Sequence, residues 1–365
     1  MVKKRIGIIV SNYSGPFEMM ALLYAKGIVE SNCCQVSSLV IAGGYENLYE
    51  IIQDKFDGIH DIKAVYIDPT VSPLLRPILS KEFRKAIDEI YDNNDLVISL
   101  WFPGAIMATG YTKIRKTIFL MCDSQVKLIK TTIKNLTFSK KAFAYLAYLC
   151  YSVLEFYIST FAYKAIYASV HDLNKRRKSQ KNIIVAKLPL QFTSVQKKKA
   201  GTPLPKIILV PRPDIQLLCQ FIKNLEGVSQ YEIKVLLNSP IPSEILNKIT
   251  HIKYIDNYFD FFKDGGIVAL LDSGGAGMSN RSLLISSLGL PFVGTPDSIR
   301  GHEVSLPNCL LISNDMSSLA RSVVDNIDYL SIISTTELDN YITQYHYSNA
   351  VIPIIDSIAT FNRHS

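Results

Sequence analysis

The stretch that decides the fold is Val268–Gly301, VALLDSGGAGMSNRSLLISSLGLPFVGTPDSIRG. An apolar run ends at Leu271, and a turn of small residues, Gly274–Gly277, then leads into a helical pattern with Arg281 in its first turn. Small residues let a backbone approach a phosphate, whose charge the free N–H groups and the helix dipole attract. Arg281 adds a fixed cation suited to a diphosphate. The stretch predicts a strand–turn–helix unit with an anion site. The alternative is a simple tight turn with a solvent-facing arginine.

Outward from this stretch, apolar runs alternate with helical patterns along nearly the whole chain. Runs rich in Ile and Val and bounded by polar turns are typical of parallel strands buried on both faces, and their alternation with helices predicts an open α/β sheet. The predicted strands are Arg5–Val10, Val36–Ala42, Ala64–Ile67, Asp95–Leu100, Thr117–Met121, Ala165–Ser169, Asn182–Ala186, Lys206–Val210, Ile233–Leu237, Ile252–Ile255, Gly266–Leu271 and Pro291–Gly294. The predicted helices include Phe17–Glu30, Lys81–Asn93, Asp214–Asn224, Ser243–Ile249 and one near Ser317–Asn326.

A length of 365 residues suits two domains of this kind. The segment 191–205, with three lysines, one glycine and two prolines, interrupts the alternation and is interpreted as a linker. It separates an acceptor-side domain at 1–190 from a second domain at 206–335. The helical residues 336–365 either cap the second domain or cross back to the first. Two doubly wound, Rossmann-like domains of this kind are expected to face each other across a ligand-binding cleft.

The six cysteines form no CxxC pair and have no histidine-rich neighbourhood, so neither a zinc site nor a disulfide framework is expected. The run Arg5–Val10 is too short for the core of a signal peptide and is better interpreted as a first buried strand. These features favour a reduced, cytoplasmic compartment.

The positive charge is concentrated in the first half. Ser124–Ala200 holds fifteen Lys or Arg and two acidic residues, a net charge of +13, whereas the whole chain carries +7. Five of these lysines precede the apolar stretch Ala142–Tyr163, namely Lys127, Lys130, Lys134, Lys140 and Lys141. No nucleic-acid-binding motif accompanies them.

The apolar stretch Ala142–Tyr163 is long enough to span a bilayer but carries polar residues at helical spacing: Tyr145, Tyr148, Ser152, Glu155 and Ser159. A glutamate facing lipid disfavours a spanning helix. Two interpretations stay open. One is a helix packed on the first domain with its polar stripe in solvent. The other is an interfacial helix within the basic segment 124–181, with tyrosines at the head groups and lysines attracted to an anionic membrane surface.

Residues 274–301 resemble the nucleotide-sugar-binding segment of GT-B glycosyltransferases, especially the family 4 type. That segment has a Gly-x-Gly turn, a basic residue opening a helix and a G-x-P-V-V-x-T strand, matched by Gly275–Gly277, Arg281 and Gly289–Thr295. Ile207–Gln216 is similar to the first strand of the family's second domain, with Arg212 at the position that meets the donor phosphate. The opening segment of the chain is similar to the first strand and acceptor-side loop of the family's first domain, with Gly15 in the turn. The resemblance implies a donor site formed by Gly15, Gly274, Gly275, Ala276, Gly277, Met278, Ser279, Asn280 and Thr295.

Two positions depart from the family pattern. Leu284 replaces a glutamate that binds the donor ribose, and Leu217 replaces a frequent lysine. Asp123 follows a buried strand at its carboxyl end and is a candidate base or sugar ligand, with a helix cap as the alternative. His302, beside Glu303, either contacts the sugar or belongs to a surface loop. His171 and His60 are weaker candidates for chemistry.

The resemblance implies a retaining glycosyltransferase with Arg212 and Arg281 at the donor phosphates, and Asp123 is added as the third candidate catalytic residue. No acidic constellation suggests a divalent ion, so the transfer is expected to be metal-independent. Such an enzyme would move sugar from a nucleotide-sugar donor to a glycan in surface polysaccharide biosynthesis. The basic segment suggests a lipid-linked acceptor and peripheral attachment to the cytoplasmic face of the inner membrane, with no nucleic-acid partner. The alternatives are a nucleotide-sugar epimerase or phosphorylase of the same fold, or a non-catalytic relative.

Overall fold

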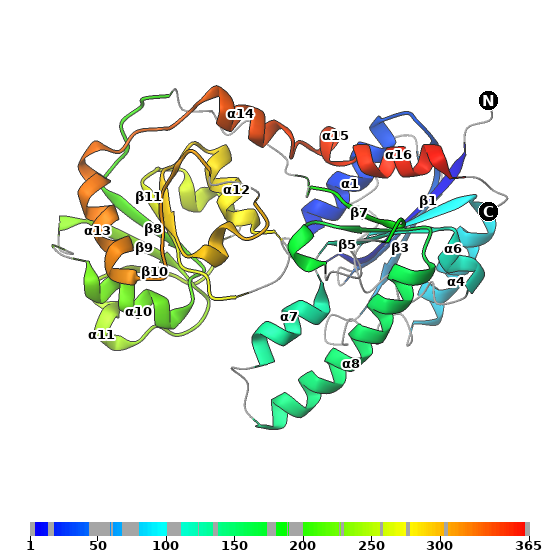
Figure 1. Ribbon diagram of the computed structural model, residues 1–365, viewed down its shortest axis with the longest axis horizontal. Coiled ribbons are helices and arrows are strands. Elements are labelled where there is room, and N and C mark those ends of the chain that lie inside the picture. The colour runs from blue at the N-terminus through cyan, green and yellow to red at the C-terminus, as the bar shows by residue number, and fades with distance from the viewer. Residues whose placement is uncertain are drawn as a thin grey trace. The chain divides into compact units, whose positions relative to one another are not determined.

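The computed structural model divides by its internal contacts into two units, Met1–Gln191 with Tyr345–Ser365, and Phe192–Gln344 (Figure 1). It describes residues 4–13, 18–43, 59, 61–67, 80–100, 111–122, 124–133, 138–173, 180–187, 189, 200–225, 227, 230–255, 258–274, 278–302 and 306–361. Most of the predicted linker, 191–199, lies outside these residues. Its last residues, 200–205, belong to the second unit, where the amide of Leu204 donates to the carbonyl of Leu330 at 2.9 Å.

The first unit contains a seven-stranded sheet in the order β3-β2-β1-β4-β5-β6-β7, and all its neighbouring strands run parallel. Its strands are β1 (Arg5–Tyr13), β2 (Gln35–Gly43), β3 (Asp61–Tyr66), β4 (Leu96–Leu100), β5 (Thr117–Cys122), β6 (Lys164–Tyr167) and β7 (Ile183–Val185). Each overlaps a strand predicted from an apolar run. Every residue of β4 is buried, as expected for a central parallel strand covered on both faces.

Helices are interleaved with these strands. They are α1 (Glu18–Glu30), α4 (Lys81–Asn93), α6 (Tyr111–Arg115), α7 (Gln125–Thr132), α8 (Phe138–Phe161), α15 (Tyr347–Ala350) and α16 (Ile352–Thr360). The hydroxyl of Ser80 caps α4 by accepting from the amide of Phe83. The C-terminal helices pack within this unit, since the Tyr347 hydroxyl donates to the Glu30 carboxylate at 2.8 Å and Lys4 donates to the carbonyl of Ile358 at 2.8 Å.

Helix α8 has the opposite orientation to the one expected for a packed helix with its polar stripe in solvent. Glu155 and Ser159 are 0% and 1% exposed. Both oxygens of the Glu155 carboxylate accept from the Ser124 hydroxyl at 3.1 Å, and one also accepts from the amide of Val126 at 3.1 Å. That interpretation was therefore wrong for the second half of the stripe, because hydrogen bonds from the start of α7 satisfy a carboxylate that pattern alone would place in water.

The second unit contains a six-stranded parallel sheet in the order β10-β9-β8-β11-β12-β13. Its strands are β8 (Ile207–Pro211), β9 (Glu232–Leu236), β10 (Thr250–Ile252), β11 (Ile267–Leu270), β12 (Phe292–Gly294) and β13 (Cys309–Ile312). Its α-helices are α10 (Ile215–Asn224), α11 (Ser243–Leu246), α12 (Asn280–Ser287), α13 (Met316–Asn326) and α14 (Thr336–Thr343). Strand β13 was not predicted, and β10 begins two residues before its predicted range.

The close approach of β8 and β11 depends on a glycine. Gly266 has φ of +132°, and a Cβ atom there would lie 2.4 Å from the carbonyl oxygen of Ile207. In both sheets the strand order reverses direction at the centre, between β1 and β4 in the first and between β8 and β11 in the second. Ligands of open α/β sheets bind outside the carboxyl ends of the strands at such a point. The predicted two Rossmann-like α/β domains are confirmed, and the sheet order indicates a ligand site at these reversal points.

Candidate functional site

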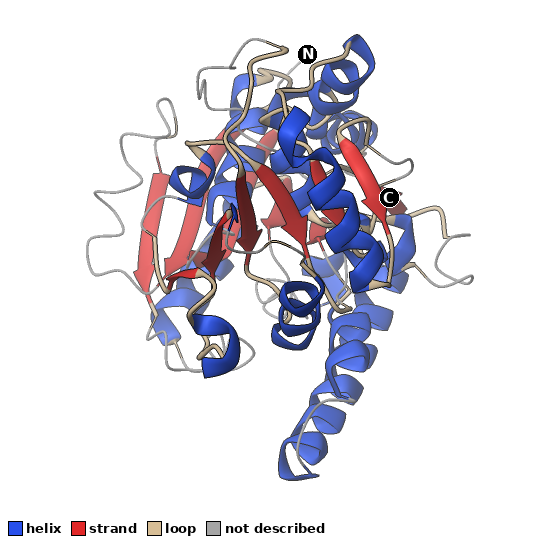
Figure 2. Ribbon diagram, turned by 90° about the vertical axis from the view of Figure 1, so that its left-hand side faces the viewer, coloured by secondary structure: helices blue, strands red, loops and turns tan. Residues whose placement is uncertain are grey.

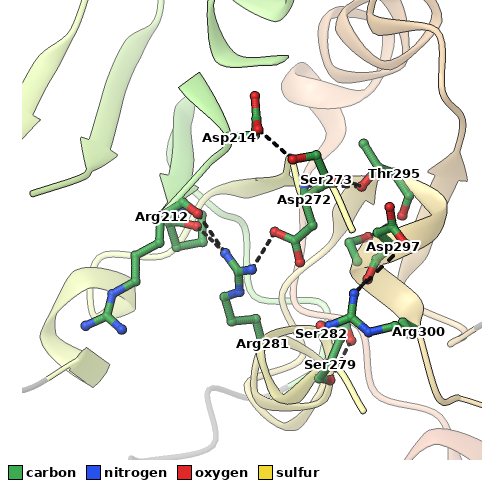
Figure 3. A network of polar contacts seen from close by, with 12 residues as sticks. Arg212, Asp214, Asp272, Ser273, Ser279, Arg281, Ser282, Thr295, Asp297 and Arg300 are labelled. Carbon is green, nitrogen blue, oxygen red and sulfur yellow. Dashed lines mark hydrogen bonds and ion pairs between the residues drawn. The ribbon is translucent and has the colours of Figure 1, made fainter. Parts of the chain in front are cut away.

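The candidate donor site lies at the carboxyl ends of β8, β11 and β12 in the second unit. Arg212 follows β8, Asp272 and Gly274 follow β11, and Thr295 follows β12. Arg281 reaches the same place from the first turn of α12. Figure 3 shows the guanidinium of Arg281 between the backbone of Arg212 and the carboxylate of Asp272. The fold thus brings together two arginines separated by about seventy positions in the sequence.

Arg212 adopts a backbone conformation that is rare for a residue with a side chain. Its φ is +48°, and its amide donates to the carbonyl of Leu236 at 2.7 Å. Strained backbone of this kind costs about 1–3 kcal/mol and tends to occur at functional sites. The exposed guanidinium of Arg212 lies over the ring of Tyr258, 5.2 Å from its centroid. Among the described residues it forms no ion pair, so its charge is available to an anion.

Arg281 is held by three contacts. One nitrogen donates to the carbonyls of Pro211 at 3.0 Å and Arg212 at 2.9 Å, and the other lies 2.6 Å from a carboxylate oxygen of Asp272. Asp272 is 6% exposed, and burial raises the pKa of its carboxyl group, while Arg281 and Arg300 oppose that rise. Arg281 therefore fixes the end of β8 and compensates a buried carboxylate, and its remaining N–H groups are the ones that can reach a ligand.

A second pair of charged residues, Asp297 and Arg300, binds the backbone at the start of the glycine turn. Gly274, with φ of +73°, donates its amide to the carboxylate of Asp297 at 2.6 Å. Its carbonyl accepts from Arg300 at 2.9 Å. The Thr295 hydroxyl donates to the carbonyl of Asp272 at 2.7 Å and joins the ends of β11 and β12. The amide predicted to bind phosphate is thus bound to a carboxylate, and Gly275, Ala276 and Gly277 lie outside the described residues.

The other predicted donor-binding residues are mostly enclosed. Met278 and Ser279 are buried, and Ser279 donates its amide to the carbonyl of Arg300 at 2.8 Å. Asn280 opens α12. His302 lies against the Ser282 hydroxyl at 2.9 Å and the Tyr341 hydroxyl at 3.0 Å. Because His302 is buried and bonded at both ring nitrogens, it packs inside the unit and is not part of a surface loop.

Three contributors to this site were missed from the sequence: Asp297, Arg300 and Tyr258. The first two stand three residues apart just after a predicted strand, a position that could have identified them. The Tyr258 hydroxyl is buried and has no hydrogen-bond partner among the described residues. Burial raises the pKa of Tyr258 to about 12, against the opposing effects of Arg281 and Arg212. The phenol stays protonated at neutral pH and can donate a hydrogen bond.

In the first unit the structure describes only part of the predicted site. Asp123, Gly15 and Lys134 lie outside the described residues. Directly after Asp123, Ser124 donates its amide to the carboxylate of Asp172 at 3.1 Å. Of the predicted membrane-surface lysines, Lys130 and Lys140 are exposed and Lys141 is half-buried. Lys127 forms an ion pair with the buried Asp172 at 3.6 Å.

Across the described part of the chain, no three His, Cys, Asp or Glu side chains gather in a group that could hold a metal ion.

The fold of both units is that of GT-B glycosyltransferases. No known sequence family matches the chain, and no curated protein does. Among solved structures, Anabaena HepE in complex with UDP and glucose matches with a TM-score of 0.63 at 11% identity, covering 98% of this chain and 100% of that one. A glycosyltransferase from Rickettsia africae matches with a TM-score of 0.62 at 13% identity, covering 99% and 100%. A putative UDP-N-acetylglucosamine 2-epimerase from Listeria monocytogenes matches with a TM-score of 0.54 at 13% identity, covering 99% and 97%.

Proposed function

We propose that this protein is a glycosyltransferase that moves a sugar from a nucleotide-sugar donor to a glycan acceptor. The observation that carries the proposal is the pair Arg212 and Arg281 at the central carboxyl ends of the second sheet, where open α/β sheets bind ligands. Support comes from the fold shared with a structure that holds UDP and glucose.

The chemistry that such a site performs is mainly electrostatic. The difficult step is departure of the nucleoside diphosphate from the anomeric carbon, which leaves negative charge on its terminal phosphate. Arg212, whose guanidinium is exposed, and the free N–H groups of Arg281 would stabilise that charge. Tyr258, whose ring lies under the guanidinium of Arg212, would add one neutral hydrogen-bond donor. With cations of this kind the reaction needs no metal ion.

In this proposal the first unit binds the acceptor. We assign Asp123, the residue that follows β5 in the sequence, as the group that takes the proton of the acceptor hydroxyl or orients that hydroxyl. Retention of the anomeric configuration follows from the family resemblance. The charge of +13 in Ser124–Ala200 supports a lipid-linked acceptor at the cytoplasmic membrane face, as in surface polysaccharide assembly.

The test begins with ligand binding. UDP, GDP, dTDP and CDP are compared by thermal shift, and the nucleotide that stabilises the protein then identifies the donor class. Release of that diphosphate from its sugar donor only when a glycan acceptor is present supports transfer. No stabilisation by any of the four nucleotides would contradict the proposal and favour a non-catalytic relative.

A nucleotide-sugar 2-epimerase is the second candidate, favoured by the fold match to the Listeria protein. It would use the same arginines to hold the diphosphate. Conversion of the donor sugar without any acceptor distinguishes it from a transferase.

A further inference from the structure

Helix α8 exposes an apolar face that the first unit leaves uncovered. The side chains on it are Phe143, Leu146, Leu149, Val153 and Phe156, which are 72%, 59%, 60%, 70% and 46% exposed. Ala142, Leu146, Leu149, Val153 and Phe156 follow one another at spacings of four and three residues, which places them on one side of a helix. A contiguous exposed patch of this kind marks an interaction surface.

This face contains no charge. Between Lys141 and Lys164 the only ionisable acid or base other than tyrosine and cysteine is Glu155, and that carboxylate is buried. A helix that faces water normally carries charged residues on its outer side. Figures 1 and 2 show α8 extending from the unit, with its N-terminal half away from the strands.

The opposite face of α8 determines this orientation. Ile158 and Ala162 lie in the core cluster of the first unit, and Tyr151 and Leu154 pack against it. Glu155 accepts from the Ser124 hydroxyl and the Val126 amide, so turning the helix would break these bonds. The apolar residues are therefore held outward by hydrogen bonds and packing on the inner side.

Charge decides which partner fits. Lys130 and Lys140 are exposed near the start of α8, within a segment of net charge +13. Two copies of this surface would bring like charges together, and α8 has no exposed acidic residue among its described side chains to pair with those lysines across a helix dimer. An anionic bilayer offers both the apolar interior and the opposite charge. Exposed Tyr145 and half-buried Tyr157 border the strip, where interfacial tyrosines are favoured.

The helix is long and apolar enough to cross a membrane by composition, over Lys140–Phe161. Its second half packs on the core from Tyr151 onward, however, so the part that projects, residues 138–150, is about 20 Å long at 1.5 Å per residue. That length falls short of the hydrocarbon core of about 30 Å. Crossing the bilayer would also require Glu155 to leave its partners.

We propose that α8 docks on an anionic lipid bilayer, with Leu146, Leu149 and Val153 inserted at the boundary between head groups and acyl chains and the neighbouring lysines on the head groups. The proposal identifies an anionic membrane as the partner of the proposed glycosyltransferase. It rests on that function, because the membrane would present the lipid-linked acceptor. Binding to lipid is measured independently of nucleotide binding.

The test uses the full chain and vesicles of phosphatidylcholine, with or without phosphatidylglycerol, in a co-sedimentation assay. The triple variant Leu146→Ser, Leu149→Ser, Val153→Ser is expected to lose about tenfold or more of its affinity for anionic vesicles, because it removes the inserted apolar area. The matched control changes three exposed apolar residues elsewhere and is expected to bind like the wild type: Leu246→Ser, Tyr254→Ser and Ile352→Ser.

Three further measurements separate the outcomes. The variant Lys130→Ala, Lys140→Ala is expected to lose the preference for phosphatidylglycerol. Vesicle binding by the triple serine variant at the wild-type level would overturn the proposal. So would a wild-type protein that binds no vesicles and that light scattering shows to be a dimer, if the triple serine variant is a monomer. The thermal shift with the nucleotide should be equal in both triple variants. If no nucleotide shifts the melting temperature of the wild type, that result counts against the proposed function but does not affect the conclusion about lipid binding.

Discussion

Replacing Arg281 by alanine tests the two roles that the structure gives this residue. The side chain binds two backbone carbonyls at the end of β8 and compensates Asp272, whose side chain is only 4% exposed. Removing one partner of a largely buried ion pair typically costs about 3–5 kcal/mol. Since Arg281 is itself 30% exposed, we expect Arg281→Ala to lower the free energy of unfolding by about 3 kcal/mol at neutral pH.

The pH dependence of this loss has a definite sign. Burial already raises the pKa of Asp272 in the folded protein, and Arg281 is the largest influence that opposes this rise. In Arg281→Ala the pKa rises further. A folded-state pKa above the unfolded value means that the fold favours the protonated carboxyl, so stability falls as pH rises from the unfolded value through the folded one. The gap between variant and wild type should therefore widen from acidic to neutral pH.

A double-mutant cycle separates stability from binding. Asp272→Asn removes the charge that Arg281 compensates, so the double variant should recover much of the stability lost in Arg281→Ala while nucleotide binding stays impaired. Urea unfolding at several pH values measures the first effect, and the nucleotide thermal shift measures the second. Arg321→Ala, an exposed change in α13, is the control and should shift stability by less than about 0.5 kcal/mol. Full nucleotide binding by the double variant would refute the phosphate role of Arg281.

Three further changes test other contacts. Arg212→Gly should leave stability unchanged or raise it by up to about 1 kcal/mol in urea unfolding, because glycine adopts φ of +48° without strain, yet it should abolish the nucleotide thermal shift. An intact shift would exclude Arg212 from the site. Tyr258→Phe should cost little stability, because the buried hydroxyl lacks a partner among the described residues. It should weaken the nucleotide thermal shift, and a shift equal to that of the wild type would exclude the phenol from nucleotide binding. Glu155→Ala should cost about 2 kcal/mol or more in urea unfolding, because the Ser124 hydroxyl and the Val126 amide lose a charged acceptor, and a neutral effect would mean that water replaces it.

Much of the fold could be predicted because buried parallel strands leave a strong local pattern. Each residue of β8 and β11 is buried, and both appear in the sequence as short apolar runs. Strand β13 is different: its four residues are only half-buried, and its sequence, CLLI, is preceded by the polar Asn308. The run is nevertheless apolar throughout, and it was missed because periodicity cannot distinguish so short a run from part of a buried helix.

The orientation of α8 could not be predicted for a different reason. The periodicity separated its polar and apolar sides, but the side that faces the protein depends on partners distant in the chain. Glu155 is satisfied by Ser124, which lies 31 residues earlier. At the candidate site, likewise, the glycine turn and Arg281 were visible in one stretch, whereas the contact of Arg281 with the carbonyl of Arg212 joins residues 69 positions apart.

Except for Arg212, which forms no ion pair among the described residues, the charges of the donor site are balanced within the site itself, and this affects how a nucleotide can bind. Arg281 faces Asp272, and Arg300 contacts the backbone carbonyl of Asp297 while the Asp297 carboxylate holds the Gly274 amide. A diphosphate would therefore meet one exposed, unpaired guanidinium and otherwise paired charges, so its binding should depend less on salt than attraction to a surface of many unpaired lysines. The basic segment near α8 has little such compensation, because it holds fifteen basic residues against two acids, one of which already pairs with Lys127. Lipid binding through this segment should weaken steeply as salt rises. A salt titration followed by both the nucleotide thermal shift and vesicle co-sedimentation would thus distinguish the donor site from the α8 surface. Equal salt dependence in the two assays would contradict the assignment of phosphate binding to the donor site and of membrane attraction to α8.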